Sequence, residues 1–91
     1  MYCVYVLYSA KYDKIYIGYT SNLIARFHGH NSLSPTGFTK RFRPWVVVHV
    51  DFYDSKKEAM IQEKRLKGGQ GRQWIKDDLL LKAKTLGLIS A

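Results

Sequence analysis

The fold of this chain is decided by two stretches near its start, Tyr2-Cys-Val-Tyr-Val-Leu-Tyr-Ser9 and Ile15-Tyr-Ile-Gly-Tyr19. Both are rich in β-branched and aromatic residues, which favours strands. The polar residues 10–14 between them predict a turn, and therefore an antiparallel hairpin. Because residues 2–9 are apolar on both faces, the first strand should be covered on both sides. Gly18 should end the second strand, where the backbone turns tightly or lets a ligand approach.

The next segment predicts a helix followed by a long loop and a third strand. Thr20, Ser21 or Asn22 can cap a helix that runs to about His30. Residues 31–44 show no periodicity, and a loop of this length is more often functional than not. Residues 45–53 read as a strand, in which three consecutive valines at 46–48 predict a central or well-covered position. The apolar side of the helix should hold Leu23, Ile24 and Phe27.

Two more helices complete the pattern. Ser55 and Glu58 have capping-box spacing, so a helix should begin near residue 55 and run to about Lys67. Glycines at 68, 69 and 71 should break it as an inter-helix turn. A last helix, from about residue 72 to 86, should present Ile75, Leu79, Ala83 and Leu86 to the core. The order β-β-α-β-α-α predicts one α+β domain over residues 1–91, with helices packed on a three-stranded sheet.

The charge balance points to a polyanionic partner. The chain has 91 residues, with fifteen Lys and Arg against seven Asp and Glu, and a net charge of +8. Nucleic acid is the commonest partner of such a surface, although the excess can also serve solubility alone. The single cysteine, Cys3, can form no internal disulfide, and no apolar run reaches the roughly 20 residues of a membrane span. These features predict a cytoplasmic protein without a membrane segment.

Glu63 is the candidate that carries most weight. On a helical wheel it falls inside the arc of Ala59, Met60 and Leu66, where a charged residue needs a partner. One interpretation is a salt bridge to an arginine such as Arg26. The other is a ligand for a hard cation, because Mg²⁺ takes one or two protein carboxylates and completes its shell with water and phosphate oxygens.

Other candidate residues suit phosphate chemistry. Arg26 and His30 share a helix stripe at i and i+4; a guanidinium can grip phosphate, and histidine moves protons near neutral pH. Each alone is more often a surface residue than a catalytic one. Tyr5 and Tyr16 are poor bases unless nearby cations lower the pKa of their phenols. Zinc motifs, a phosphate-binding P-loop and a GxSxG elbow are absent from the sequence.

A basic segment follows the loop and predicts contacts to a nucleic-acid backbone. Lys40, Arg41 and Arg43 surround Phe42, which could stack on an unpaired base. Such cations add affinity without reading sequence. Lys67, close to Glu63 on the helical wheel, is a further candidate for binding nucleic acid. The alternative is a solvated charge run.

With these residues in view, the chain resembles the GIY-YIG nuclease domain family, specifically its small single-domain bacterial subgroup, over about residues 2–76. The first motif reads Cys3-Val4-Tyr5 and the second Tyr16-Ile17-Gly18. The resemblance implies a three-stranded antiparallel sheet and cleavage of DNA phosphodiesters with one divalent metal, Mg²⁺ or Mn²⁺. It implies that Tyr5 helps to activate water, with His30 assisting or replacing it. It further implies that Tyr16 positions water or phosphate, that Arg26 holds phosphate and that Glu63 binds the metal.

Two departures from the family pattern limit what the resemblance carries over. Cys3 and Val4 replace the first motif's glycine and isoleucine, and asparagine occurs only at 22 and 31, not late in the domain. No appended specificity domain is recognisable, so a protein partner could supply target choice, and oligomeric state stays open. The rival functions are a nucleic-acid-binding module with little chemistry and a partner-activated subunit.

The nuclease hypothesis makes a geometric demand. Tyr5, Tyr16, Arg26 and Glu63 should converge on one concave surface, with His30 at its margin. A position of Glu63 on the opposite side of the sheet from Tyr5 would refute the shared site.

Overall fold

The computed structural model describes residues 1–28 and 41–87 and contains a three-stranded antiparallel sheet. Strand β1 (Tyr2–Ser9) pairs with β2 (Lys14–Thr20) on one side and with β3 (Val46–Tyr53) on the other. Every residue of β1 from Cys3 to Ser9 is buried. The sequence therefore predicted the central strand and the α+β architecture correctly, because only a strand covered on both faces is apolar on both.

The interpretation of β3 as a central strand was wrong. The strand order is β2-β1-β3, so β3 lies at an edge, and Val46 and Val47 are 42% and 37% exposed. A valine run reports the β propensity of branched side chains, and edge and central strands share that propensity. Between Val6 and Leu7 the pairing with β3 shifts register, which leaves Val48 as the extra residue of a bulge.

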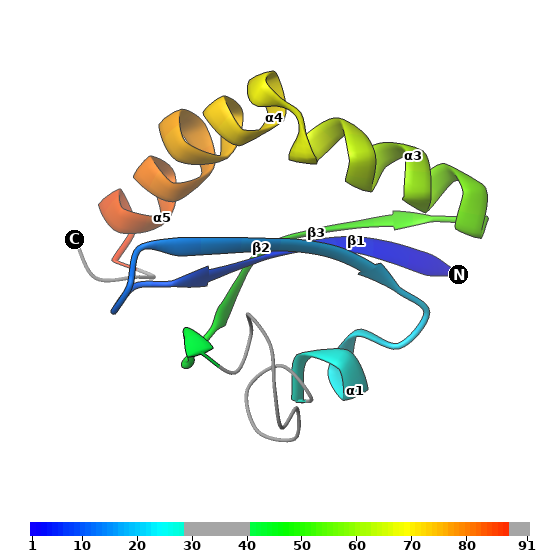
Figure 1. Ribbon diagram of the computed structural model, residues 1–91, viewed down its shortest axis with the longest axis horizontal. Coiled ribbons are helices and arrows are strands. Elements are labelled where there is room, and N and C mark those ends of the chain that lie inside the picture. The colour runs from blue at the N-terminus through cyan, green and yellow to red at the C-terminus, as the bar shows by residue number, and fades with distance from the viewer. Residues whose placement is uncertain (29–40, 88–91) are drawn as a thin grey trace.

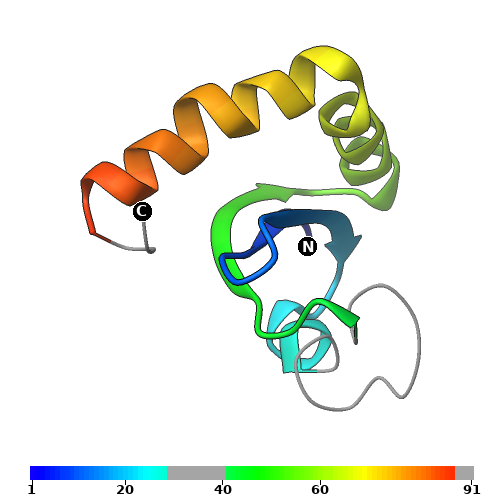
Figure 2. The ribbon, with the colours of Figure 1, turned by 60° about the vertical axis from the view of Figure 1, so that its left-hand side comes forward.

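Helices cover both faces of the sheet, and they do so unequally (Figure 1). Helices α3 (Lys56–Lys67), α4 (Gly69–Trp74) and α5 (Leu81–Thr85) arch over one face, while the short α1 (Leu23–His28) lies on the other. Figure 2 shows the same separation from another direction. Alternate β1 side chains serve the two layers. On the α3 side the core cluster contains Val4, Val6 and Tyr8; on the α1 side it contains Cys3, Tyr5, Leu7 and Trp45.

Each helix that follows a strand begins at a capping side chain. Asn22 Oδ1 accepts a hydrogen bond from the backbone N–H of Ala25 at 3.2 Å, so Asn22 is the cap of α1. Ser55 Oγ accepts from the Glu58 N–H at 3.2 Å and caps α3, as its spacing predicted. Such caps satisfy N–H groups that have no partner inside the helix. The expected apolar side of α1 was partly wrong, because Ile24 is 84% exposed.

The last helices differ from the prediction in two ways. Of the three glycines, only Gly68 lies between helices α3 and α4, whereas Gly69 and Gly71 lie inside α4. A π-helical segment, η2 (Ile75–Leu80), then joins α4 to α5. A π-turn accommodates one extra residue, so the buried partner of Ile75 is Leu80 and the predicted core residue Leu86 is 67% exposed. In the described part of the chain, no helix has the length and apolar character needed to cross a bilayer.

Candidate active site

Tyr5 and Tyr16 bring two phenol rings together on the α1 side of the sheet. The Tyr5 side chain is fully buried, and its ring stacks beside that of Tyr16 with centroids 6.3 Å apart and an interplanar angle of 28°. The Trp45 ring packs edge-on against the Tyr16 ring, with centroids 6.4 Å apart and an interplanar angle of 63°. Each ring is thereby held on a strand and against a neighbouring ring, so the two phenols have little freedom to reorient.

Gly18 is what allows this arrangement. It lies opposite Tyr5 in the β1–β2 register, inside β2 rather than at its end as expected. A Cβ at this position would lie 2.5 Å from Tyr5 Oη and 2.7 Å from Tyr5 Cζ, too close for real atoms. The glycine therefore makes room for the phenol of Tyr5 itself.

Arg26 links the two phenols from α1. Its guanidinium donates side-chain hydrogen bonds to both tyrosines, and the bond to Tyr5 is the main reason that the pKa of Arg26 is raised. The pKa of Tyr5 is raised to about 12, because burial outweighs the opposing hydrogen bond from Arg26. A nearby cation does favour the phenolate, as the sequence reasoning supposed, but desolvation is the larger effect. Tyr5 is therefore a neutral phenol at neutral pH in the unliganded protein.

Glu63 reaches the same place from the opposite layer. Its helix, α3, covers the other face of the sheet (Figures 1 and 2), which is the placement that would argue against a shared site. The two layers nevertheless meet around the edge strand β2. There, a cavity of about 310 Å³ is lined by Tyr5, Tyr16, Gly18, Tyr19, Thr20, Arg26 and Glu63. The four catalytic candidates in the described part of the chain, Tyr5, Tyr16, Arg26 and Glu63, thus share one cavity.

The carboxylate of Glu63 is mostly covered, and it has an ion-pair partner. Its side chain is 18% exposed, and Oε1 lies 3.3 Å from the ammonium nitrogen of Lys67, one helical turn on. Glu63 therefore does form an ion pair, but its partner is Lys67 and not an arginine such as Arg26, as the sequence suggested. An ion pair of this sort between a half-exposed lysine and a carboxylate is weak and can be displaced.

The donor set of the cavity suits a hard divalent cation of the magnesium type. No group of three or more His, Cys, Asp or Glu side chains gathers within residues 1–28 and 41–87. A site with the single carboxylate of Glu63 matches a cation that keeps several waters and shares phosphate oxygens, as Mg²⁺ does. It does not match a zinc site, which needs three or four protein ligands.

The remaining predicted residues have different outcomes. His30 and Lys40 lie outside the described residues. Arg41 is exposed, with its guanidinium carbon 5.4 Å from the centroid of the Phe42 ring. Phe42 is partly buried against the Tyr5 core cluster, and Tyr12 packs against it at 5.5 Å. Its ring therefore has protein neighbours on one side and the cations of Lys14 and Arg41 near it, and its stacking on a base stays a prediction.

Sequence reasoning missed two residues of the cavity, Tyr19 and Thr20. Both belong to β2, the strand that carries the second motif. Thr20 Oγ1 accepts a hydrogen bond from the N–H of Asn22 at 3.0 Å, so it also orients the start of α1. For Thr20 the available signal was the alternation of β2, because Tyr16, Gly18 and Thr20 share one face of a strand; alternation gives no such signal for Tyr19.

A cavity with two phenols, a guanidinium and a carboxylate, on an α+β domain of net charge +8, has the chemistry that suits a phosphate ester of a polyanion. Comparison with known families makes this specific. The family model described as the GIY-YIG catalytic domain matches residues 1–76, and the chain belongs to this family. Membership places it among nucleases, which are hydrolases of nucleic acid and generally depend on a divalent metal.

Relatives of known sequence agree with this assignment. A UPF0213 protein of Staphylococcus haemolyticus is 37% identical over 73 residues, covering 80% of this chain and 88% of the relative. A UPF0213 protein of Natronomonas pharaonis is 36% identical over 64 residues, covering 70% of this chain and 74% of the relative. The solution NMR structure of a UPF0213 protein from Bacillus halodurans is similar over 100% of both chains, with 26% identity and a TM-score of 0.54. The expected family and fold are therefore confirmed.

Proposed function

We propose that this domain is a metal-dependent endonuclease that hydrolyses DNA phosphodiesters, with selectivity for structure or weak selectivity for sequence. The observation that carries the proposal is the shared cavity of Tyr5, Tyr16, Arg26 and Glu63 at the β2 edge. These four side chains come from two strands and from two helices on opposite faces of the sheet, so the amino-acid composition alone does not account for their meeting in one cavity. The cavity is open to solvent on a basic molecule, as a long polyanionic substrate requires.

Each side chain has a role that follows from its chemistry. Arg26 holds the scissile phosphate and offsets the negative charge that grows in the transition state. Tyr16 orients the attacking water or the phosphate. Glu63 would hold one Mg²⁺ or Mn²⁺, which supplies Lewis-acid activation of the phosphate and stabilises the leaving oxygen. The water oxygen forms the new bond to phosphorus, its proton passes to a base, and the ester oxygen leaves.

The raised pKa of Tyr5 constrains the identity of that base. A phenol whose pKa is about 12 accepts a proton only if the bound substrate and cation lower that value first. Before that, neutral Tyr5 can donate a hydrogen bond to water or phosphate. His30 is the alternative base, and its imidazole would work near neutral pH without such activation.

A second function is favoured by one observation, the ion pair between Lys67 and Glu63. The lysine places a positive charge against the carboxylate where the metal would bind. A nucleic-acid-binding module with little chemistry, or a subunit whose partner protein displaces Lys67, would carry such a pair. Under either function we propose a reducing compartment such as the cytoplasm, in which the buried thiol of Cys3 stays free.

Replacement of Glu63 tests the proposal. Glu63→Gln keeps the shape of the side chain and removes the charge that a hard cation needs, so cleavage in Mg²⁺ or Mn²⁺ should fall at least about 100-fold while fold and affinity for DNA persist. Substrates are branched, nicked, single-stranded and duplex DNA with matched RNA, and EDTA should abolish cleavage of each.

The matched control is Glu58→Gln, an exposed glutamate on the same helix. Its cleavage rate should stay near that of the parent protein. Parent-like cleavage by Glu63→Gln would remove Glu63 from the metal site. Loss of the folded state in Glu63→Gln alone would instead assign the carboxylate to a structural ion pair.

A further inference from the structure

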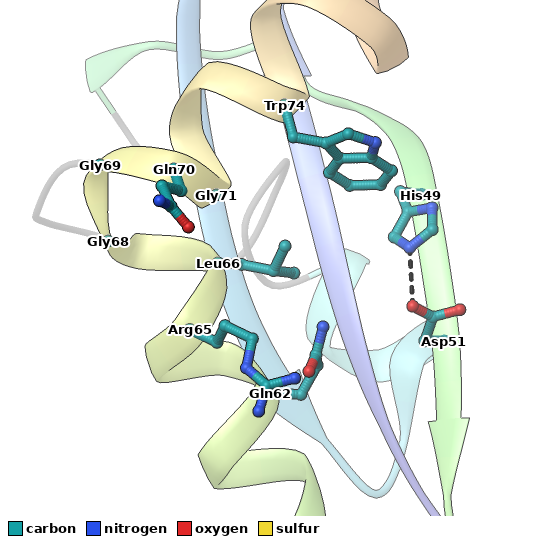
Figure 3. Close-up of a pocket in the computed structure, with 10 residues that line it drawn as sticks. All are labelled: His49, Asp51, Gln62, Arg65, Leu66, Gly68, Gly69, Gln70, Gly71 and Trp74. Atoms are coloured by element: carbon teal, nitrogen blue, oxygen red, sulfur yellow. Dashed lines mark hydrogen bonds and ion pairs between the residues drawn. The ribbon is translucent and has the colours of Figure 1, made fainter.

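A second hollow lies on the other side of α3, at the β3 edge of the sheet. Its volume is about 610 Å³, and it opens between β3 and the turn that joins α3 to α4 (Figure 3). Gln62 lines this hollow and the next residue, Glu63, lines the candidate active site. Consecutive helical residues point about 100° apart. Helix α3 therefore separates two distinct sites that face opposite edges of one sheet.

The wall opposite α3 is made by a fixed chain of three side chains. His49 and Asp51 share one face of β3, and His49 Nε2 lies 2.8 Å from Asp51 Oδ2. The imidazole packs edge-on against the indole of Trp74, with centroids 5.3 Å apart at 83°. Trp74 remains 38% exposed, and Figure 3 shows it reaching from α4 across the hollow toward His49. A large aromatic surface is thus presented to solvent in a set orientation.

The glycine-rich turn holds Trp74 in that position. The Gly68 N–H donates to the Arg65 carbonyl at 3.2 Å, and Arg72 Nε donates to the Lys67 carbonyl at 3.1 Å. A Cβ on Gly71 would collide with the backbone of Leu66, so only glycine lets α4 pack this closely on the end of α3. The hollow is therefore formed before any ligand arrives, which lowers the entropic cost of binding.

The lining groups suit a flat, neutral, heteroaromatic ligand. Arg65 is the one cation and Asp51 the one carboxylate among the lining residues, so the hollow lacks the excess of positive charge found over the whole chain. Side-chain amides come from Gln62 and Gln70, and the floor is the buried Leu66. Within the described residues, Asp51 Oδ1 has no donor, whereas Oδ2 is bonded to His49. The volume is ample for one nucleotide and within the range of small-ligand sites.

We propose that this hollow binds one unpaired nucleobase of the nucleic-acid substrate. Trp74 stacks on the base, the Gln62 amide and Asp51 Oδ1 hydrogen-bond to its edge, and Arg65 pairs with the adjoining phosphate. Aromatic stacking accepts any base, while amides and carboxylates recognise amino groups and ring nitrogens of base edges. This inference rests on the proposed function and deepens it, because it names the substrate class.

The base in the hollow must lie close to the cleaved bond, and it must be unpaired. Neighbouring strands are about 4.8 Å apart, so β2 and β3 lie on the order of 10 Å from each other across β1. A nucleotide at the β3 edge is therefore near, but not at, the phosphodiester held at the β2 edge. Inside a duplex a base cannot offer its face to Trp74. The preferred substrates are those with a single-stranded flap, bulge or gap beside the cleaved bond.

The two tryptophans of the chain provide a direct test by NMR. Trp74 is 38% exposed and lines the hollow, whereas Trp45 is 2% exposed and packs against Tyr16, so its signal reports on the candidate active site at the β2 edge. Glu63→Gln protein in EDTA is titrated with the hexamers dA6 and dT6 and with a hexamer of abasic sites of equal charge. The Trp74 signal should shift with dA6 and dT6 and stay still with the abasic strand. Any shift of the Trp45 signal should be the same with all three strands, because the proposal places only phosphate in the cavity beside it.

Affinity measurements with variants extend the test. Loss of one stacked base is worth about 1–3 kcal/mol, or roughly 5- to 150-fold, so Trp74→Leu should weaken dA6 binding by about tenfold. Trp74→Phe should retain most of the affinity. Phe52→Leu, which removes another exposed aromatic ring of β3, is the matched control and should bind like the parent. Thermal unfolding of each variant shows whether it is folded.

Because binding is measured without cleavage, the two proposals fail separately. Base-dependent binding that Trp74→Leu abolishes supports the hollow even if the domain cleaves nothing. Equal affinity for abasic and normal strands, or for Trp74→Leu and parent, overturns it even if the domain is a nuclease. Sedimentation could also show that the parent protein is a dimer and that Trp74→Leu is a monomer. If strand binding is the same in both, this result overturns the proposal and assigns the hollow to a contact between protein copies.

Discussion

At the scale of single residues, the candidate active site depends on a glycine as much as on its charged groups. Gly18 has no Cβ, and the phenol of Tyr5 fills the place that one would take. Tyr5 and Tyr16 are both hydrogen-bonded by Arg26, so a displacement of either ring is passed on to the guanidinium. The motif is therefore one packed unit of strand backbone, two phenols and a cation.

Gly18→Ala should accordingly damage both stability and catalysis. A Cβ 2.5 Å from Tyr5 Oη forces the ring to move, at a cost of about 1–3 kcal/mol in the free energy of unfolding. Urea denaturation and the cleavage rate measure the two effects. In a Tyr5→Phe background the nearest clashing atom is gone, so the same substitution should cost less. Equal costs in both backgrounds would mean that Tyr5 is not what Gly18 accommodates.

The buried phenols also predict a loss of stability in alkali. The pKa values of Tyr5 and Tyr8 are both raised to about 12 by burial, and Tyr8 also donates to Asp13 at 2.8 Å. Between pH 10 and pH 12 the unfolded chain releases phenol protons that the folded chain keeps. The free energy of unfolding should therefore fall with rising pH, by up to ~1.4 kcal/mol per pH unit for each phenol.

Urea titrations at pH 9, 10 and 11 measure this loss. Tyr5→Phe should show a shallower decline over that range, since phenylalanine has no proton to release. Tyr12→Phe, at a 42% exposed position, is the control and should decline like the parent. Identical slopes for parent and Tyr5→Phe would show that Tyr5 titrates normally in the folded protein.

At the scale of elements, the sequence pattern correctly predicted those features that depend on a single segment of the chain. The two-faced apolar run of residues 2–9 and the Ser55 cap are local signals, and both were confirmed. Glu63 could be chosen as a candidate because its place on the helical wheel depends on its own helix alone. The edge position of β3 depends on which strand pairs with which, and a valine run carries no such information. The same holds for the hollow beside Trp74, which exists only after α4 folds back on α3.

The π-helical segment shows how one residue can defeat a periodic pattern. A regular helix from Ile75 would bury residue 79 fully. In η2, Leu79 packs against the core only partly buried, and Leu80 and then Ala83 are the buried residues. If η2 contains one residue more than an α-helix needs, deletion of exposed Lys76 should place Leu80 one regular turn from Ile75. The free energy of unfolding should then change by less than about 1 kcal/mol, as measured by urea denaturation.

A second deletion provides the contrast. Removal of Lys82 shifts Ala83 relative to Leu80 with no π-turn to absorb the change, so several kcal/mol should be lost through the core contacts of α5. If both deletions cost the same, η2 does not contain an extra residue. The Leu80 methyl signals in NMR spectra would show whether that side chain is still in the core of the Lys76 deletion.

At the scale of the whole molecule, one sheet keeps two recognition sites apart. The cavity at the β2 edge gathers the groups that we propose act on phosphate, and the hollow at the β3 edge offers an indole and amides suited to a base. Helix α3 contributes to both and fixes their relative position. A small domain can thus hold a phosphodiester and a nearby unpaired base without a separate specificity domain.

A net charge of +8 predicts a surface that binds phosphates, and the segment after the loop is its expected place. Arg41 is exposed and Arg43 partly buried, while Lys40 lies outside the described residues. Replacement of all three by Ala should weaken DNA binding and reduce the slope of log K against log[salt] by roughly two to three units, because fewer counterions are released. Fluorescence anisotropy between 50 and 300 mM NaCl, roughly the range in which such slopes are linear, gives the slope.

The comparison variant replaces Lys56, Lys57 and Lys64, three exposed lysines of α3 that lie around Met60 and Ile61. It removes the same charge from another face, so net charge alone would change both slopes equally. If the segment at 40–43 contacts the backbone, only its variant lowers the slope, and its single-turnover rate at saturating DNA stays near the parent rate. A slope that falls only in the α3 variant would place the phosphate-binding surface on that helix, next to Glu63 and Lys67.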